Sequence, residues 1–266
     1  ASEEDGDTAQ TAKLTGYYIT TTMLASGVDQ VRAALSQADD YNAVMVDVKS
    51  IFGSFYYSTA ISGAAKATVL DIKQVDQLIS ELAQQKGVTL IARVPAFSDP
   101  EYALKHQSQA LPLYNGALWT DEHDCYWLNP YSNDVQGYLT SIALELAGLG
   151  FDEVLFDNFY FPDSDRISWT GSVTKQEAIL DAADNLSANL LNQSIRLDLG
   201  TNDPEVAAYG ARAFITTNNA SQIDDDIAAL SDVLPDTASQ LVYLTDSRDT
   251  RFDACGALRP LLDETE

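Results

Sequence analysis

Short apolar runs alternate with segments of helical period along most of this chain, and this alternation restricts the fold more than any other feature of the sequence. Seven runs predict strands, at residues 16–23, 43–49, 88–97, 151–157, 194–200, 211–217 and 240–247. Between them, apolar residues three or four positions apart predict helices at residues 28–35, 72–87, 134–149, 175–191 and 223–234. Repeated β-α units with right-handed crossovers form either an open doubly wound sheet or a closed (β/α) barrel.

Polar residues at the ends of the predicted strands favour the barrel. In a parallel barrel the C-terminal ends of all strands meet at one face, where active sites lie. No G-x-G-x-x-G or P-loop motif follows a predicted strand, which disfavours a nucleotide-binding open sheet. A strand-end aspartate is also a common helix N-cap or loop hydrogen-bonding residue, so each position alone has a structural alternative. The strand-end residues are Asp47, Lys49, Arg93, Asp157, Asp198 and Asp246.

The predicted fold is therefore α/β, a (β/α)8-type TIM barrel. A chain of 266 residues is long enough for one such barrel. We assign residues 13–266 to a single barrel domain and residues 1–12 to an acidic linker or tail. No eighth strand is evident after Arg248, because DACGALRPLLDETE at residues 253–266 predicts a short helix and a tail. The expectation is a barrel that is incomplete or irregular at its C-terminal end.

Charge and composition exclude several classes of partner. Fifteen basic and forty acidic side chains give a net charge of −25, which repels nucleic acid and anionic lipid. No apolar run approaches the ~18 residues of a membrane-spanning helix, so we expect no membrane insertion of the mature chain. His106 and His123 are isolated and no metal-ligand spacing occurs, so we predict neither a metal nor a cofactor. The oligomeric state is left open.

Two further features bear on the cellular location. Cys125 and Cys255 are too few for a disulfide framework, and whether they pair or stay free is left open. The sequence begins ASEEDGDTAQTA, which has neither the basic nor the apolar region of a signal peptide. A linker behind a removed signal or anchor explains this start and predicts an extracellular or cell-surface protein. An arbitrary boundary of the sequence explains it equally well.

Four segments of the chain carry motifs at the predicted strand ends and in the loop between them: VMVDVKS, VTLIARVPAFSDPEYA, GALWTDEHDCYWLNPYSNDV and LGFDEVLFDNFYFP. Their motifs are a V-D-V-K strand end, an I-A-R strand followed by D-P, a G-x-W loop followed by W-x-x-P-Y, and a G-F-D-E-x-x-F-D strand ending in F-P. Taken together in this order, the segments resemble the putative glycosyl hydrolase domain family, a group of predicted TIM-barrel glycosidases. The resemblance extends over residues 15–162 and implies a TIM-barrel glycosidase.

The resemblance implies a site residue by residue. The family's strand-four aspartate, its expected catalytic carboxylate, falls on Asp157. Its strand-two pair falls on Asp47 and Lys49, and its strand-three arginine on Arg93. The chain departs from the family at Tyr160, where an arginine is usual, and at Ser98, where a lysine is usual. The loop aromatics of the family fall on Trp119, Trp127 and Tyr131.

Glycoside hydrolysis needs two carboxyl groups that flank the scissile bond. We expect Asp157 to be the nucleophile, and Asp198 to be the general acid/base with its pKa raised by the nearby Asp157, with Asp246 as a reserve for that role. Lys49 and Arg93 would hold Asp157 ionised or bind sugar hydroxyls, and an ion pair with Asp47 is the alternative.

Aromatic side chains supply the flat apolar faces that stack on sugar rings, although packing of the loop onto the barrel is their structural alternative. We assign sugar binding to Trp119, Trp127, Tyr131 and Tyr160. Two functions remain. The first is a glycoside hydrolase acting on an extracellular poly- or oligosaccharide by a two-carboxylate mechanism. The second is a catalytically degenerate barrel that serves as a carbohydrate-binding or cell-surface module. Both predict carbohydrate as the partner.

Overall fold

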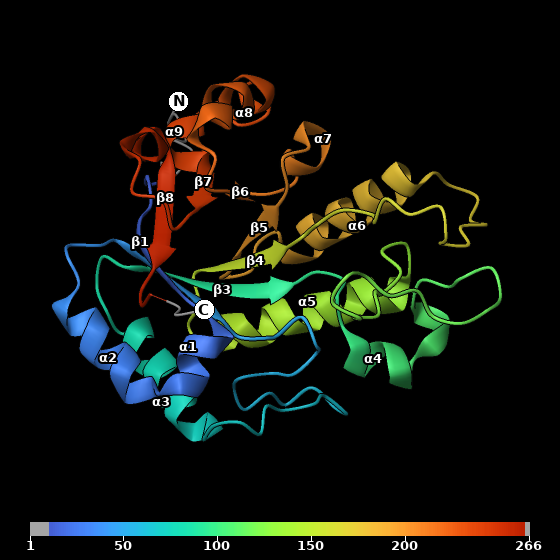
Figure 1. Cartoon of the computed structure of the whole chain (residues 1–266), viewed down its shortest axis with the longest axis horizontal. Coiled ribbons are helices and arrows are strands. Elements are labelled where there is room, and N and C mark those ends of the chain that lie inside the picture. Colours follow the sequence, from blue (N-terminus) through green and yellow to red (C-terminus); the bar gives the residue numbers. More distant parts are fainter. Residues whose placement is uncertain (1–10, 264–266) are drawn as a thin grey trace, which may run out of the picture.

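Eight parallel strands close into one barrel in sequence order, each strand pairing with the next and the eighth with the first. The computed structural model describes residues 11–263 of the chain (Figure 1). This closed barrel confirms the predicted fold class. The strands are β1 Thr15–Ile19, β2 Ala43–Asp47, β3 Thr89–Pro95, β4 Glu153–Asp157, β5 Arg196–Gly200, β6 Arg212–Thr216, β7 Leu241–Leu244 and β8 Gly256–Pro260.

The eighth strand corrects the prediction of a short helix and a tail. Strand β8 pairs with β7 and with β1, so the barrel is complete within the described residues. A short helix is present, but it is the 3-10 helix η3 at Thr250–Ala254, before the strand. Gly256 is the first residue of β8 and Pro260 is the last, and a glycine and a proline so close together are typical of a turn. A proline is nevertheless tolerated at the end of a strand, because few ladder hydrogen bonds are lost there.

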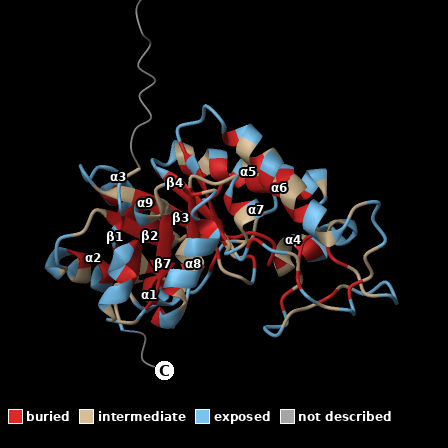
Figure 2. Ribbon diagram, turned by 90° about the horizontal axis from the view of Figure 1, so that it is seen from above, coloured by how far each residue is buried: buried red, intermediate tan, exposed pale blue. Residues whose placement is uncertain are grey.

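The barrel separates two apolar cores. Along β2 the side chains of Ala43 and Met45 pack inside the barrel, and those of Val44 and Val46 pack against the surrounding helices. Both faces of the strand are thus covered, which explains its continuous apolar sequence. Figure 2 shows this arrangement, with buried strands at the centre and helices exposed only on their outer sides.

The helices are unequal around the barrel. Local sequence sets their starts: Thr174 and Glu177 form a reciprocal capping box at the start of α6, and Asp71 and Asp99 cap α3 and α4. The helices are α1 Thr21–Ser26, α2 Val28–Gln37, α3 Ile72–Ala83, α4 Pro100–Lys105, η1 Gln107–Gln109, α5 Asn133–Gly148, α6 Lys175–Leu190, α7 Pro204–Ala207, η2 Ala220–Gln222, α8 Ile223–Leu230 and α9 Thr237–Gln240.

Long connections follow β2, β3 and β4, at residues 48–71, 96–132 and 158–174. All three leave the C-terminal ends of neighbouring strands, and in Figure 1 they extend beyond the tips of β3 and β4. The C-terminal face of this side of the barrel is therefore walled by loops, which is where a site is expected in this fold.

The remaining predictions about the chain have mixed outcomes. Of the predicted linker at residues 1–12, residues 1–10 lie outside the described residues. Cys125 and Cys255 are both buried and free, which answers the question of their pairing. Within residues 11–263 no helix is long and apolar enough to cross a membrane.

Candidate active site

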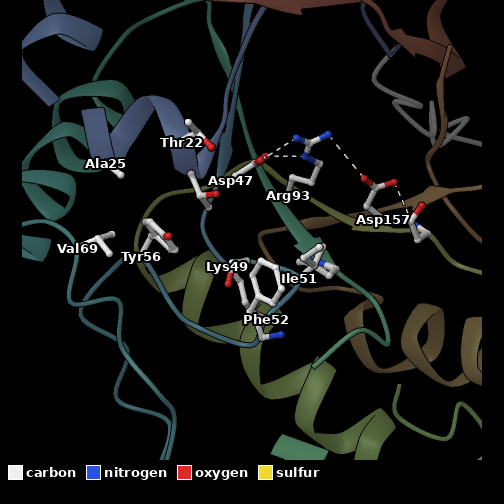
Figure 3. Close-up of a pocket in the computed structure, with 14 residues that line it drawn as sticks. Thr22, Ala25, Asp47, Lys49, Ile51, Phe52, Tyr56, Val69, Arg93 and Asp157 are labelled. Atoms are coloured by element: carbon white, nitrogen blue, oxygen red, sulfur yellow. Dashed lines mark hydrogen bonds and ion pairs between the residues drawn. The ribbon is translucent and has the colours of Figure 1, made fainter. Parts of the chain in front are cut away.

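A pocket of about 610 Å³ opens at the C-terminal ends of β1 to β4. Its walls come from the start of α1, from the connection after β2 and from the ends of β3 and β4 (Figure 3). The carboxylates that line it are those of Asp47 and Asp157, and its cationic groups are Arg93 and Lys49. Four of the ten predicted site residues are thus brought together, from three neighbouring strands.

Arg93 joins the two carboxylates. Its Nε lies 2.6 Å from Asp47 Oδ1 and its Nη2 2.7 Å from Asp47 Oδ2, a bidentate pair. Its Nη1 lies 3.7 Å from Asp157 Oδ2 (Figure 3). Burial lowers the pKa of Arg93, but the negative charges of Asp47 and Asp157 raise it by more than burial lowers it. The net shift of the pKa is upward, and the guanidinium stays charged. Asp157 therefore faces a permanent cation.

The backbone fixes the position of Asp157. Its Oδ1 accepts a hydrogen bond of 2.8 Å from the backbone N–H of Asn158, a residue in the left-handed region at φ 53°. On the β5 side, Gly200 accepts a hydrogen bond from the N–H of Phe159. The side chain of Asp157 is 20% exposed, so the strand holds a carboxylate that solvent and ligand can still reach.

Lys49 pairs with neither of the two predicted carboxylates. Its Nζ lies 2.9 Å from Asp99 Oδ2, in an ion pair that is almost fully buried, and not beside Asp157 or in a pair with Asp47. Asp99 also accepts hydrogen bonds from the hydroxyl of Tyr138 and from the N–H of Tyr102. Lys49 therefore anchors the connection after β2 to the start of α4 and to α5. This ion pair could not be predicted from the sequence, because Asp99 is fifty residues away along the chain.

Asp198 lies elsewhere than predicted. It occupies the middle of β5, and it is fully buried inside the barrel beside Glu153 and Arg212. Burial, and then the charge of Glu153, raise the pKa of Asp198 well above its ordinary value. The neighbouring charge that raises the pKa of Asp198 is thus that of Glu153 and not that of Asp157. Asp198 does not line the pocket.

Asp246 follows the end of β7 and is exposed. Its backbone N–H donates to Asn218 Oδ1 at 3.1 Å, which ties the ends of β6 and β7 together. The residue stands on the same face of the barrel as Asp157, but it does not line the pocket.

The predicted aromatic residues lie outside the pocket. Trp119 and Trp127 are buried and pack edge to face, as in the structural alternative. Tyr160 is 49% exposed and lies against Trp127, with ring centroids 5.4 Å apart. Tyr131 is 38% exposed and does not line the pocket either.

The sequence reasoning missed the aromatic residues that do line the pocket. Phe52 and Tyr56 come from the connection after β2, and Phe52 is 57% exposed. The signal was present in IFGSFYY at residues 51–57, an aromatic segment directly after a strand end that carries Asp47 and Lys49. An exposed phenylalanine beside a carboxylate offers the flat apolar face that a sugar ring needs.

The pattern of a known family matches residues 16–244, and its description is "Putative glycosyl hydrolase domain". The chain belongs to this family. The match includes the four strand ends at the pocket and confirms the resemblance found in the sequence. It also continues past residue 162, through the part of the chain where the resemblance could not be followed.

Several solved structures have a similar fold. A hypothetical protein from Ruminiclostridium thermocellum is 28% identical, with a TM-score of 0.59 over 68% of this chain and 96% of that one. The Ega3 protein of Aspergillus fumigatus, solved with galactosamine, is 12% identical, with a TM-score of 0.59 over 95% of this chain and 93% of that one. The second likeness shows the fold alone.

A third similar structure is a glycoside hydrolase family 20 exo-β-N-acetylglucosaminidase from Vibrio harveyi, solved with N-acetylglucosamine. It is 10% identical, with a TM-score of 0.59 over 88% of this chain and 41% of that one. No curated protein sequence is significantly similar to this chain. The family supports a glycoside hydrolase, and the Aspergillus fumigatus and Vibrio harveyi structures show the fold alone.

Proposed function

We propose that this protein is a glycoside hydrolase that cleaves an extracellular poly- or oligosaccharide with two carboxylates, one of which is Asp157. The observation that carries the proposal is the position of Asp157, at the end of β4 in a pocket of about 610 Å³ and beside a permanently charged arginine. Membership of the putative glycosyl hydrolase domain family supports it.

The charge distribution suits an ionised carboxylate in the reaction. The transition state of glycoside hydrolysis carries positive charge on the sugar ring. Arg93 places a positive charge 3.7 Å from Asp157 Oδ2. Asp157 then either attacks the anomeric carbon or stabilises the charge that develops there. Phe52 would support the ring of the bound sugar.

The second carboxylate is the less determined part of the mechanism. Asp47 is held by two hydrogen bonds to Arg93, and Asp198 is buried below the pocket. Asp246 remains as the candidate acid/base, since it is exposed on the same face of the barrel. It would donate a proton to the leaving oxygen when a substrate spans the mouth of the barrel from β4 to β7.

One observation favours the second candidate function, a carbohydrate-binding or cell-surface module. The two carboxylates that line the pocket, Asp47 and Asp157, both form ion pairs with Arg93. A barrel that had lost its acid/base would keep the pocket and Phe52, and would bind sugar without cleaving it.

Hydrolysis assays distinguish the two functions. The purified protein is assayed on oligomers of galactosamine, N-acetylglucosamine and glucose, and on the matching aryl glycosides, with binding measured in parallel. The comparison includes Asp157→Asn, Asp246→Asn and the control Asp165→Asn, which changes an exposed loop carboxylate. Galactosamine and N-acetylglucosamine come first because similar folds were solved with them.

Turnover by the wild type and by Asp165→Asn, together with its loss in Asp157→Asn, supports the hydrolase. Loss in Asp246→Asn as well supports the second carboxylate. Binding without turnover on any member of the panel, with binding unchanged in Asp157→Asn, contradicts the hydrolase and favours the binding module. Fractionation of the source organism with an antibody against the protein tests the extracellular location.

A further inference from the structure

A second cavity, of about 450 Å³, lies on the other side of the end of β4. The pocket described above is bounded by β1, β2 and β3, and it reaches Asp157 and Asn158. The second cavity begins with the next residue, Phe159, and is bounded by the connection after β4, by the start of α6 and by the connection after β5. Because β4 lies between β3 and β5 in the barrel, the two cavities flank Asp157.

A half-exposed aromatic ring forms part of the second cavity. Tyr160 is fixed from behind by the buried Trp127, whose Nε1 donates to Asp121 at 2.7 Å. Trp127 therefore supports the ring of Tyr160 from the protein side. The exposed part of Tyr160 is a preorganised apolar surface, which costs little conformational entropy when a ligand binds.

Polar groups at fixed positions complete the cavity. Gln176 Nε2 donates to Asp203 Oδ2 at 2.7 Å, which orients both side chains. Lys175 donates to the carbonyl of Ser164 and lies over the ring of Phe161. Asn202 is exposed and lines the same cavity. An aromatic surface with amide, carboxylate and ammonium groups around it matches the alternating apolar faces and hydroxyl edges of a sugar.

We infer that the second cavity is a carbohydrate subsite, and that the glycan binds across Asp157 with sugar units in both cavities. The preferred substrate is then a chain of several sugars that is cleaved internally, and single sugars bind poorly. Cleavage of the chain rests on the proposed function, whereas the binding of a chain across both cavities can be tested without turnover.

The test is the dependence of binding on chain length. Affinities for the monomer and hexamer of galactosamine and of N-acetylglucosamine are measured by calorimetry with Asp157→Asn, so that no hydrolysis interferes. The same measurements follow in Asp157→Asn combined with Tyr160→Ala, with Tyr160→Phe or with the control Tyr114→Ala. Tyr114 is 76% exposed and lines neither cavity.

The expected result is a hexamer that binds more tightly than its monomer, and a loss of about tenfold in hexamer affinity with Tyr160→Ala. Tyr160→Phe keeps most of the affinity because the ring remains, and Tyr114→Ala keeps all of it. Equal hexamer affinity in Tyr160→Ala and Tyr114→Ala overturns the inference, as does the failure of both hexamers to bind. If the hexamer shows the Tyr160 effect but the wild type cleaves nothing, the subsite stands and the proposed hydrolase fails.

Discussion

A Cβ atom on Gly200 would lie 2.8 Å from the Cα of Asp157 and 2.9 Å from the backbone nitrogen of Asn158. These distances are shorter than real Cβ contacts, and the atoms they meet belong to backbone that cannot move aside easily. The last residue of β5 must therefore be glycine for the end of β4 to carry its carboxylate where it does.

We predict that Gly200→Ala destabilises the fold by about 1–3 kcal/mol, because the methyl group overpacks the β4–β5 contact. The displacement of Asp157 should lower the rate of glycan hydrolysis about a hundredfold, since small misplacements of a reacting group greatly slow a reaction. Urea denaturation and turnover measure the two effects. Gly137→Ala is the matched control. A Cβ atom on Gly137 of α5 would meet no atom within 4 Å in the described residues outside its chain neighbours and its own helix backbone, so this variant should gain a little stability and lose no activity. Unchanged turnover in Gly200→Ala would show that Asp157 tolerates the shift.

The buried pair of Lys49 and Asp99 should be worth far more than an exposed pair of the same types. Lys49→Met leaves the carboxylate of Asp99 buried without its cation, and we expect a loss of about 3–5 kcal/mol in the free energy of unfolding. Lys105→Met removes the half-exposed pair with Glu101 and should cost about 0–1 kcal/mol. Chemical denaturation of the two variants gives the comparison. Similar losses in both would mean that the buried pair has no special role in holding the connection after β2.

Phe52 should matter for ligand and not for stability. It is 57% exposed in the pocket that Asp157 also lines, so Phe52→Ala should leave the free energy of unfolding within about 0.5 kcal/mol of the wild type. Hexamer affinity should fall about tenfold if the ring stacks on a sugar. Calorimetry with Asp157→Asn as background, and Tyr114→Ala as the exposed aromatic control, separates the two quantities. Full affinity in Phe52→Ala would remove this residue from the proposed site.

The sequence predicted the parts of the site that depend on strand pattern. The ends of β2, β3 and β4 carry Asp47, Arg93 and Asp157 after clear apolar runs, and a parallel barrel necessarily collects such ends at one face. Strand pattern does not specify which distant residue meets a side chain, so the partner of Lys49 was missed. It also does not place a strand end to within one residue.

The error at Asp198 shows the second limit. The predicted strand at residues 194–200 and the observed β5 both reach Gly200, so Asp198 lies two residues before the end of the strand and not at it. Two residues along a strand separate a reactive carboxylate at the mouth from a buried one inside the barrel. The same difficulty hid β8, whose terminal glycine and proline resemble a turn.

The buried position of Asp198 leads to the last prediction, which concerns stability and pH. Among residues 11–263, neither carboxylate oxygen of Asp198 has a hydrogen-bond partner. Glu153 beside it is already held by Arg212 and by Arg196. Burial raises the pKa of Asp198 and its negative neighbour raises it further, so the folded protein keeps this proton at pH values where the unfolded chain has lost it.

The sign of the effect follows from that difference. Above the ordinary pKa of about 3.9, the folded state binds one proton more than the unfolded state, so the contribution of Asp198 to stability falls as pH rises until its own pKa is passed. Asp198→Asn carries no titrating group, and its amide can donate to Glu153 as the protonated acid does. The wild type should therefore lose stability relative to Asp198→Asn as pH increases from about 4 toward 8.

Urea denaturation across this pH range measures the difference between the two proteins, with Asp165→Asn as the exposed control that should parallel the wild type. Glu153 titrates as well. Burial raises its pKa, but the hydrogen bond with protonated Asp198 and the charge of Arg212 lower it by more, so the net shift of the pKa is downward. Its contribution therefore changes as pH falls below its ordinary pKa of 4.5, which affects only the acid end of the range compared. Parallel curves for wild type and Asp198→Asn between pH 4 and pH 8 would mean that Asp198 releases its proton equally in both states, and that the floor of the barrel accommodates a second buried negative charge.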